Sequence, residues 1–138
     1  MAVNVDESTQ LSAEKENAMN YTILIYETPA EFALRKDPER MKTYWPEWPK
    51  YTKALIDAGI FVGGAGLEPP ATGTTVRIRG GKRLVQDGPY AETKEQLGGY
   101  YIVNVPSLDV ALDWAAKCPA APLGSIEVRP NLDPAACS

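Results

Sequence analysis

The 138-residue chain contains no histidine and only two cysteines, Cys118 and Cys137. Without histidine, the chain has no Ser-His-Asp or Cys-His nucleophilic site, no imidazole proton shuttle and no His-ligated metal centre. The two cysteines lack the second pair that a zinc cluster would need, and they do not form a CxxC motif. We therefore expect no metal site, and we expect any chemistry to come from carboxylate, Tyr, Arg, Lys, Ser or Thr side chains.

The sequence also lacks a surplus of positive charge, since 14 Lys and Arg face 18 Asp and Glu residues for a net charge of −4. Nucleic-acid binding needs a basic surface, so we expect no nucleic-acid partner. The one basic cluster surrounds a tight turn and is typical of a solvated hairpin tip: Arg77, Arg79, Lys82 and Arg83.

Long apolar runs are absent too, and the acidic start of the chain does not resemble a signal peptide. We expect no membrane partner, a cytoplasmic location and free thiols. The glycines between residues 63 and 66 lack the spacing of a phosphate loop, and Pro69-Pro70 prevents the helix that would follow one. We therefore predict no nucleotide and no other cofactor.

The composition divides the chain into one domain with two extensions. Residues 1–18 are polar, acidic and without pattern, which indicates a flexible N-terminal extension. Residues 19–131 are expected to form the folded domain, and residues 132–138 a Pro- and Ala-rich tail.

The apolar pattern of the domain predicts strands and helices in alternation. A β-branched and aromatic run over 21–26 predicts the first strand. Asp37-Pro38 is typical of a helix start, and the following helical pattern is interrupted by Pro46 and Pro49 before it ends at Gly59. The remaining predictions are a strand at 60–67, a hairpin of 74–79 with 82–86 around Gly80-Gly81, a strand at 99–105, a helix from Ser107 to Pro119 and a strand at 125–129.

This order predicts an α+β fold in which an antiparallel sheet carries two helices on one face. The first strand nevertheless has apolar residues on both sides, because Tyr21, Ile23 and Ile25 alternate with Leu24 and Tyr26. A symmetric homodimer that packs sheet against sheet would cover the second face.

Several segments resemble the DGPF branch of the YCII-related proteins. The longest is DGPYAETKEQLGGY over residues 87–100, in which Tyr90 replaces the usual Phe. The similarity covers about residues 20–131 and includes the segments 71–77, 114–119 and 124–130. The resemblance implies a ferredoxin-like fold that dimerises through its sheets as a dimeric α/β barrel.

The resemblance implies less about activity. Most DGPF proteins have no assigned function, and many are encoded beside extracytoplasmic-function sigma factors. Some relatives in the wider group resemble cofactor-free enzymes that use a His with an Asp. This chain has Leu123 where a His often stands, so only Asp87 matches that pair.

Asp87 has two interpretations. It follows a strand and precedes Gly88-Pro89, so its carboxylate could accept local backbone N–H groups in an Asx turn. Alternatively, Asp87 lies in a cleft and acts as a general base.

Other candidate residues would bind a ligand. Arg77 would clamp an anion, although a cross-strand ion pair with Glu127 is the structural alternative. Tyr90 would donate a hydrogen bond, and Tyr100 would contact the ligand. Tyr101 is its neighbour on the strand and points to the opposite face, so at most one of the two lines the site. Trp45 and Trp48 belong to an aromatic stripe that forms core or borders an opening for a flat apolar ligand.

The sequence thus predicts a homodimeric small-molecule binding protein, with its cleft between the sheet, the first helix and residues 87–98. Any catalysis would be proton transfer or isomerisation of a small anionic or aromatic compound, with Asp87 as base, Arg77 as clamp and Tyr90 as donor. The alternative is a non-enzymatic regulatory partner linked to sigma-factor-dependent transcription.

Overall fold

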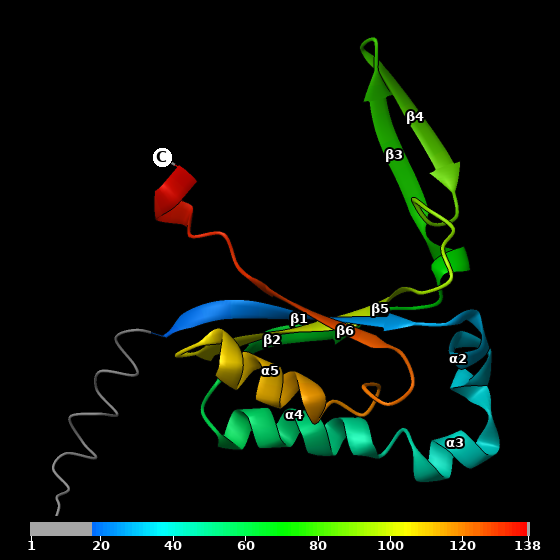
Figure 1. The fold of residues 1–138 in the computed structure, drawn as a ribbon. Helices are drawn as coiled ribbons and strands as arrows, with labels where there is room; N and C mark the ends of the chain where they lie inside the picture. The colour runs from blue at the N-terminus through cyan, green and yellow to red at the C-terminus, as the bar shows by residue number, and fades with distance from the viewer. Residues whose placement is uncertain (1–17, 138) are drawn as a thin grey trace, which may run out of the picture.

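Residues 18–137 are described by a computed structural model, and their fold is a sheet covered by helices on one face (Figure 1). The sheet has four antiparallel strands in the order β2-β5-β1-β6. These strands are β1 (Met19–Glu27), β2 (Phe61–Gly66), β5 (Gln96–Val105) and β6 (Ser125–Pro130). The flexible extension predicted for residues 1–18 lies, except for its last residue, outside the described part of the chain.

The helices are α2 (Pro29–Ala33), α3 (Pro38–Thr43), α4 (Glu47–Asp57) and α5 (Leu108–Ala116). Helices α4 and α5 lie side by side under the sheet. A helix precedes β2, and another precedes β6. The strands β1 and β5 lie at the centre of the sheet, as in a ferredoxin-like fold. The α+β, ferredoxin-like prediction is therefore confirmed. No helix of the described residues is long and apolar enough to span a membrane.

Of the two breaks predicted in the first helical region, the one at Pro46 is confirmed, whereas Pro49 lies inside the first turn of α4. The Asp37 carboxylate accepts a hydrogen bond of 3.2 Å from the Arg40 amide and caps α3. Pro46 then separates α3 from α4. Gly59 ends this region at a φ of 74°, a conformation that favours glycine.

A separate hairpin is inserted between β2 and β5. Its strands are β3 (Thr74–Arg79) and β4 (Lys82–Asp87), and both turn glycines, Gly80 and Gly81, have positive φ. The hairpin forms its own two-stranded sheet, which rises from the face opposite α4 and α5 (Figure 1). We define residues 74–87 as the arm.

The predicted cross-strand pair of Arg77 with Glu127 is wrong, because β3 pairs with β4 while β6 pairs with β1. Glu127 instead accepts hydrogen bonds from Arg129 at 2.8 Å and from the Tyr26 hydroxyl at 3.0 Å. Both interactions stabilise the carboxylate and lower the pKa of Glu127, with Arg129 as the larger cause.

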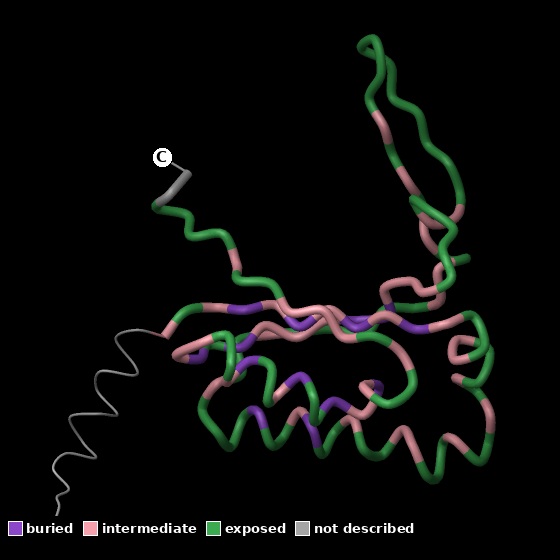
Figure 2. Tube along the Cα trace, viewed as in Figure 1, coloured by how far each residue is buried: buried purple, intermediate pink, exposed green. Residues whose placement is uncertain are grey.

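The hydrophobic core lies between the sheet and the two long helices, where Figure 2 shows the buried segments. Alternate residues of β1 point into it, as the sequence pattern predicts. Leu55 of α4 and Ala111 of α5 are fully buried against them. The other buried apolar residues of the core are Tyr21, Ile23, Ile25, Tyr51, Val103, Val105, Ala115, Cys118 and Ala120.

Cys118 is buried beyond the end of α5, and burial raises the pKa of its thiol to about 11. At pH 8 only about one such thiol in a thousand is ionised, whereas an ordinary thiol is about one quarter ionised. In a chain carrying Cys137→Ser, we expect iodoacetamide to modify Cys118 more than about 100-fold more slowly than in urea. Equal rates, measured by intact mass, would contradict the buried placement.

Candidate functional site

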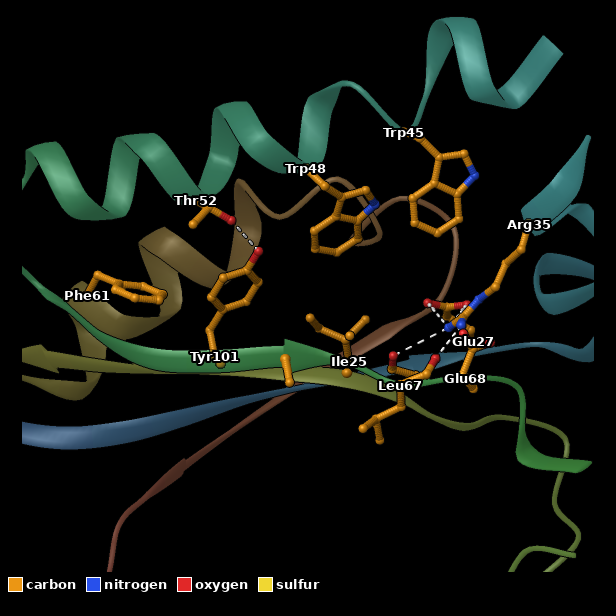
Figure 3. Close-up of a pocket in the computed structure, with 15 residues that line it drawn as sticks. Ile25, Glu27, Arg35, Trp45, Trp48, Thr52, Phe61, Leu67, Glu68 and Tyr101 are labelled. Carbon is orange, nitrogen blue, oxygen red and sulfur yellow. Dashed lines mark hydrogen bonds and ion pairs between the residues drawn. The ribbon is translucent and has the colours of Figure 1, made fainter. Parts of the chain in front are cut away.

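A cavity of about 400 Å³ opens between α4 and the strands β2, β5 and β1, and Figure 3 shows its walls. One wall is aromatic, the floor is rich in glycine and one end carries charged side chains. The lining residues are Ile25, Glu27, Arg35, Trp45, Trp48, Thr52, Phe61, Gly64, Ala65, Gly66, Leu67, Glu68, Gly98, Gly99 and Tyr101.

The aromatic wall comes from both layers of the fold. Trp48 projects from the first turn of α4 toward Tyr101 of β5, and their rings are nearly parallel, with centroids 6.3 Å apart. Phe61 meets Tyr101 edge to face at the same centroid distance. Trp45 lies just before α4, on the side of Arg35. Such rings present flat apolar surfaces to a ligand.

The floor of the cavity lacks side chains because glycines occupy its inward-facing positions. Gly66 pairs with Gly99, which pairs with the buried Ile25, so all three face the helices. A Cβ at Gly66 would have no atom within 4 Å. A Cβ at Gly64 would lie 2.6 Å from the Tyr100 carbonyl oxygen. The glycines therefore create the cavity and allow close strand pairing.

A carboxylate and a guanidinium close one end of the cavity. Glu27 is the last residue of β1, and alternation with Ile25 turns it toward the helices, where its side chain is 10% exposed. Arg35 follows α2 in a short 3-10 helix, and its Nη2 donates to the two Glu27 oxygens at 3.4 and 3.3 Å. Arg35 also donates to the carbonyl oxygens of Leu67, just after β2, and of Gly98 in β5.

Three buried N–H groups of the lining residues have no hydrogen-bond partner among residues 18–137: Arg35 Nε, Trp45 Nε1 and Trp48 Nε1. A buried donor without a partner costs about 1–3 kcal/mol, and a ligand with acceptor atoms would recover that cost. The lining therefore combines an aromatic wall with unpartnered donors, beside the acceptor oxygens of Glu27.

The nearby tyrosines carry neutral hydroxyl groups. Tyr101 shares a hydrogen bond of 2.6 Å with Thr52, and burial raises the pKa of Tyr101. Burial also raises the pKa of Tyr44 to about 12. Both residues are therefore protonated at neutral pH and can donate hydrogen bonds.

Of the residues predicted to bind a ligand, Trp45 and Trp48 line the cavity. Tyr100 alternates with Tyr101 and is not among the lining residues; it pairs with Leu24 on the opposite face of the sheet. The sequence-based prediction names Tyr100 as the ligand contact and allows at most one of the two tyrosines in the site, whereas the cavity is lined by Tyr101.

Asp87, Arg77 and Tyr90 belong to the arm and the residues just after it, away from the cavity. Asp87 pairs with Thr74, so it alternates to the arm face opposite Arg77. Asp87 is the exposed last residue of β4 and makes no side-chain hydrogen bond within residues 18–137. The Arg77 guanidinium lies over the Tyr90 ring, 5.4 Å from its centroid. Tyr90 lines a second, shallower groove of about 600 Å³, whose carboxylates are Glu68 and Glu95. The roles predicted for Asp87, Arg77 and Tyr90 stay predictions.

Sequence reasoning missed Glu27 and Arg35. The alternation of the first strand contains the signal for Glu27, since it continues the inward series of Tyr21, Ile23 and Ile25. Arg35 lies between short helices that no apolar pattern marks. The described residues contain no group of three Asp, Glu, Cys or His side chains that could hold a metal ion.

Comparisons with known proteins agree with the fold. The YCII-related domain matches residues 19–133. An uncharacterized protein of Rhizobium meliloti (strain 1021) is 44% identical over 80 residues, which cover 56% of this chain and 64% of that protein. The match thus spans less than two thirds of the relative. The domain match covers most of the chain, and the protein therefore belongs to the YCII-related family.

Proposed function

We propose that this YCII-related protein binds a small, flat, unsaturated molecule that carries hydrogen-bond acceptors, in the cavity between α4 and the sheet. The observation that carries the proposal is the pairing of an aromatic wall with the unpartnered donors Arg35 Nε and Trp45 Nε1. Trp48 and Tyr101 would contact the flat body of the ligand. The acceptors would meet the unpartnered donors after a side-chain movement, because these nitrogens are buried in the unliganded protein.

The size of the cavity supports the same class of ligand. At about 400 Å³, it lies within the usual range of about 300–1,000 Å³ for small-molecule sites. Glu27 adds acceptor oxygens beside Arg35, so a ligand that presents both an acceptor and a donor would satisfy the charged end.

Filling the cavity from its floor tests the proposal. Anilinonaphthalene sulfonate (ANS) is a suitable probe, because it is flat, aromatic and carries acceptor oxygens. In Gly66→Leu the new side chain enters the cavity, where a Cβ meets no atom. We expect ANS affinity, measured by fluorescence titration, to fall at least about tenfold, or about 1.4 kcal/mol of binding free energy.

Gly63→Leu is the matched control. Gly63 is on the same strand, pairs with Ile102 on the other face and also has open space around a Cβ. This variant should bind ANS with an affinity within about twofold of the parent chain. Equal losses in both variants, or no loss in Gly66→Leu, would show that the probe binds elsewhere.

Catalysis by Asp87, with Arg77 as anion clamp and Tyr90 as donor, is a second proposal for a different place in the molecule. The contact of Arg77 with Tyr90 beside a groove favours it. A general base must come within about 3 Å of the proton that it removes. Asp87 and Arg77 line neither the 400 Å³ cavity nor the second groove, and Tyr90 lines the groove, so this chemistry would need a ligand that extends from the groove to Asp87.

We also propose that the protein is a homodimer of the DGPF branch, located in the cytoplasm, whose sheets pack face to face. The sequence of residues 87–100 supports the branch. Leu24, Tyr26 and Ile102 support the dimer, since they lie on the sheet face that no helix covers. The sigma-factor-linked regulatory role stays a prediction, and no contact described above favours it.

A further inference from the structure

The arm carries apolar residues that the rest of residues 18–137 leaves uncovered. Val76, Ile78 and Val85 are 59%, 60% and 54% exposed. Val76 and Val85 are directly paired, and Ile78 lies two residues along the strand from Val76, so the three form one stripe on one face of the hairpin. We call these three residues the arm stripe.

The two faces of the arm differ in what they meet. The opposite face includes Arg77, which contacts the Tyr90 ring and donates a hydrogen bond of 3.4 Å to Gln86. That face therefore meets the chain that leaves the arm near Arg77, although Leu84 on the same face is 50% exposed. The arm stripe is on the other face, and its three members all stay more than half exposed.

An uncovered two-stranded hairpin is physically weak. Such hairpins are marginally stable in water and need a further strand or a packing surface for independent stability. Among the described residues, β3 and β4 pair only with each other, in a sheet of two strands. A surface that covers the arm stripe would supply the missing apolar contact.

We infer that the arm stripe packs against a second copy of this chain, so that two copies exchange arms across their dimer. This inference rests on the proposed sheet-to-sheet dimer. It adds that each arm extends past the sheet interface and contacts the second copy.

The reach of the arm fits this arrangement. Each arm strand has six residues, which extend about 20 Å at about 3.3 Å per residue. Packed sheets lie about 10 Å apart. The arm rises from the bare face of the sheet (Figure 1), so it is long enough to pass the facing sheet and contact the body of the second copy.

Charge favours a second copy as the occupant. The arm has four basic residues and one acidic residue, a net charge of +3. The other described residues, 18–73 and 88–137, carry 13 acidic and 9 basic residues, a net charge of −4. Each arm would therefore be attracted to the body of another copy, and salt would weaken the attraction.

Photo-crosslinking of the full chain tests the arm and the dimer separately. Benzoylphenylalanine is placed at Ile78 in the arm stripe, at Leu24 on the bare sheet face, or at Met41 on α3 as a control. We expect products of twice the chain mass from the first two positions and none from Met41.

The outcomes are distinguishable. Crosslinks from Leu24 alone would contradict the exchange of arms and would still support the face-to-face dimer. Crosslinks from Ile78 alone would support the arm contact and overturn the face-to-face sheets. If neither position gives a crosslink, both the arm contact and the face-to-face dimer are wrong. If the arm instead binds a DNA duplex and Arg83→Glu abolishes that binding, the assignment of a second copy is wrong.

A variant measures the size of the effect. With Val76→Ser, Ile78→Ser and Val85→Ser combined, we expect the dimer dissociation constant from analytical ultracentrifugation to rise at least about 100-fold. The matched variant removes equal apolar surface from the helices, through Met41→Ser, Ile56→Ser and Leu112→Ser, and should change the constant less than about threefold. Equal effects of the two variants would contradict the arm contact.

Discussion

Replacing Arg35 with methionine should lower the free energy of unfolding by about 2–4 kcal/mol, because it leaves the Glu27 carboxylate without its cation. The two side chains are 18% and 10% exposed, so solvent screens the pair only in part. Arg35 also loses its bonds to the carbonyl oxygens of Leu67 and Gly98, which hold the charged end of the cavity together. Urea unfolding of the variant and the parent measures the difference.

Two variants separate this effect from general loss of charge. Adding Glu27→Gln to Arg35→Met removes the unpaired carboxylate and should restore part of the loss. Lys53→Met breaks an exposed pair with Asp57, whose side chains are 75% and 61% exposed, and should cost less than about 1 kcal/mol. If Arg35→Met costs no more than Lys53→Met, Glu27 and Arg35 do not form a buried pair.

The second large effect is expected at Gly124, which lies at the entry to β6. A Cβ at this position would overlap the Tyr26 carbonyl oxygen of β1, a backbone atom that cannot rotate away. Gly124→Ala should therefore push β6 away from β1 and lower the free energy of unfolding by about 1–3 kcal/mol or more. The change is measured by urea unfolding together with amide exchange of the β6 residues.

Gly63→Ala is the control for this substitution. Gly63 is also at a strand position, but a Cβ there meets no atom within 4 Å. The alanine should be neutral or slightly stabilising, because it restricts the unfolded chain. Similar losses at both positions would show that the effect comes from the loss of glycine flexibility and not from the contact with Tyr26.

Local chemistry made most of the fold predictable. Asp37 before Pro38, Gly59 after the helical pattern and Gly80-Gly81 between two β-branched runs each specify a backbone conformation within a few residues. The structure has these features where the sequence predicts them. The ferredoxin-like expectation rests on the order of the elements along the chain and on the family resemblance, and it needs no residue-specific contact.

The position of the hairpin was harder to predict, because its sequence specifies only its own pairing. Thr74 to Arg79 has the same β-branched composition as a strand within a larger sheet. No residue pattern in this segment indicates that β3 and β4 form a sheet of their own. The predicted pair of Arg77 with Glu127 is wrong for that reason.

The candidate site, like the fold, is predictable from the sequence only in part. The aromatic stripe predicted Trp45 and Trp48 as residues that border an opening, and both line the cavity. Trp48 is on α4, whereas Trp45 lies in the turn just before it. The charged end depends on Arg35 reaching Glu27 from a turn between short helices. Such a contact is set by tertiary structure and by side-chain rotamers, which no spacing of residue types contains.

A crystal structure of the full chain grown with ANS would test the central claim most directly. The account predicts ring density between Trp48 and Tyr101, with the sulfonate directed toward Arg35 and Trp45. Density beside Asp87 and Tyr90 at the base of the arm, with the cavity under α4 left without probe, would contradict it.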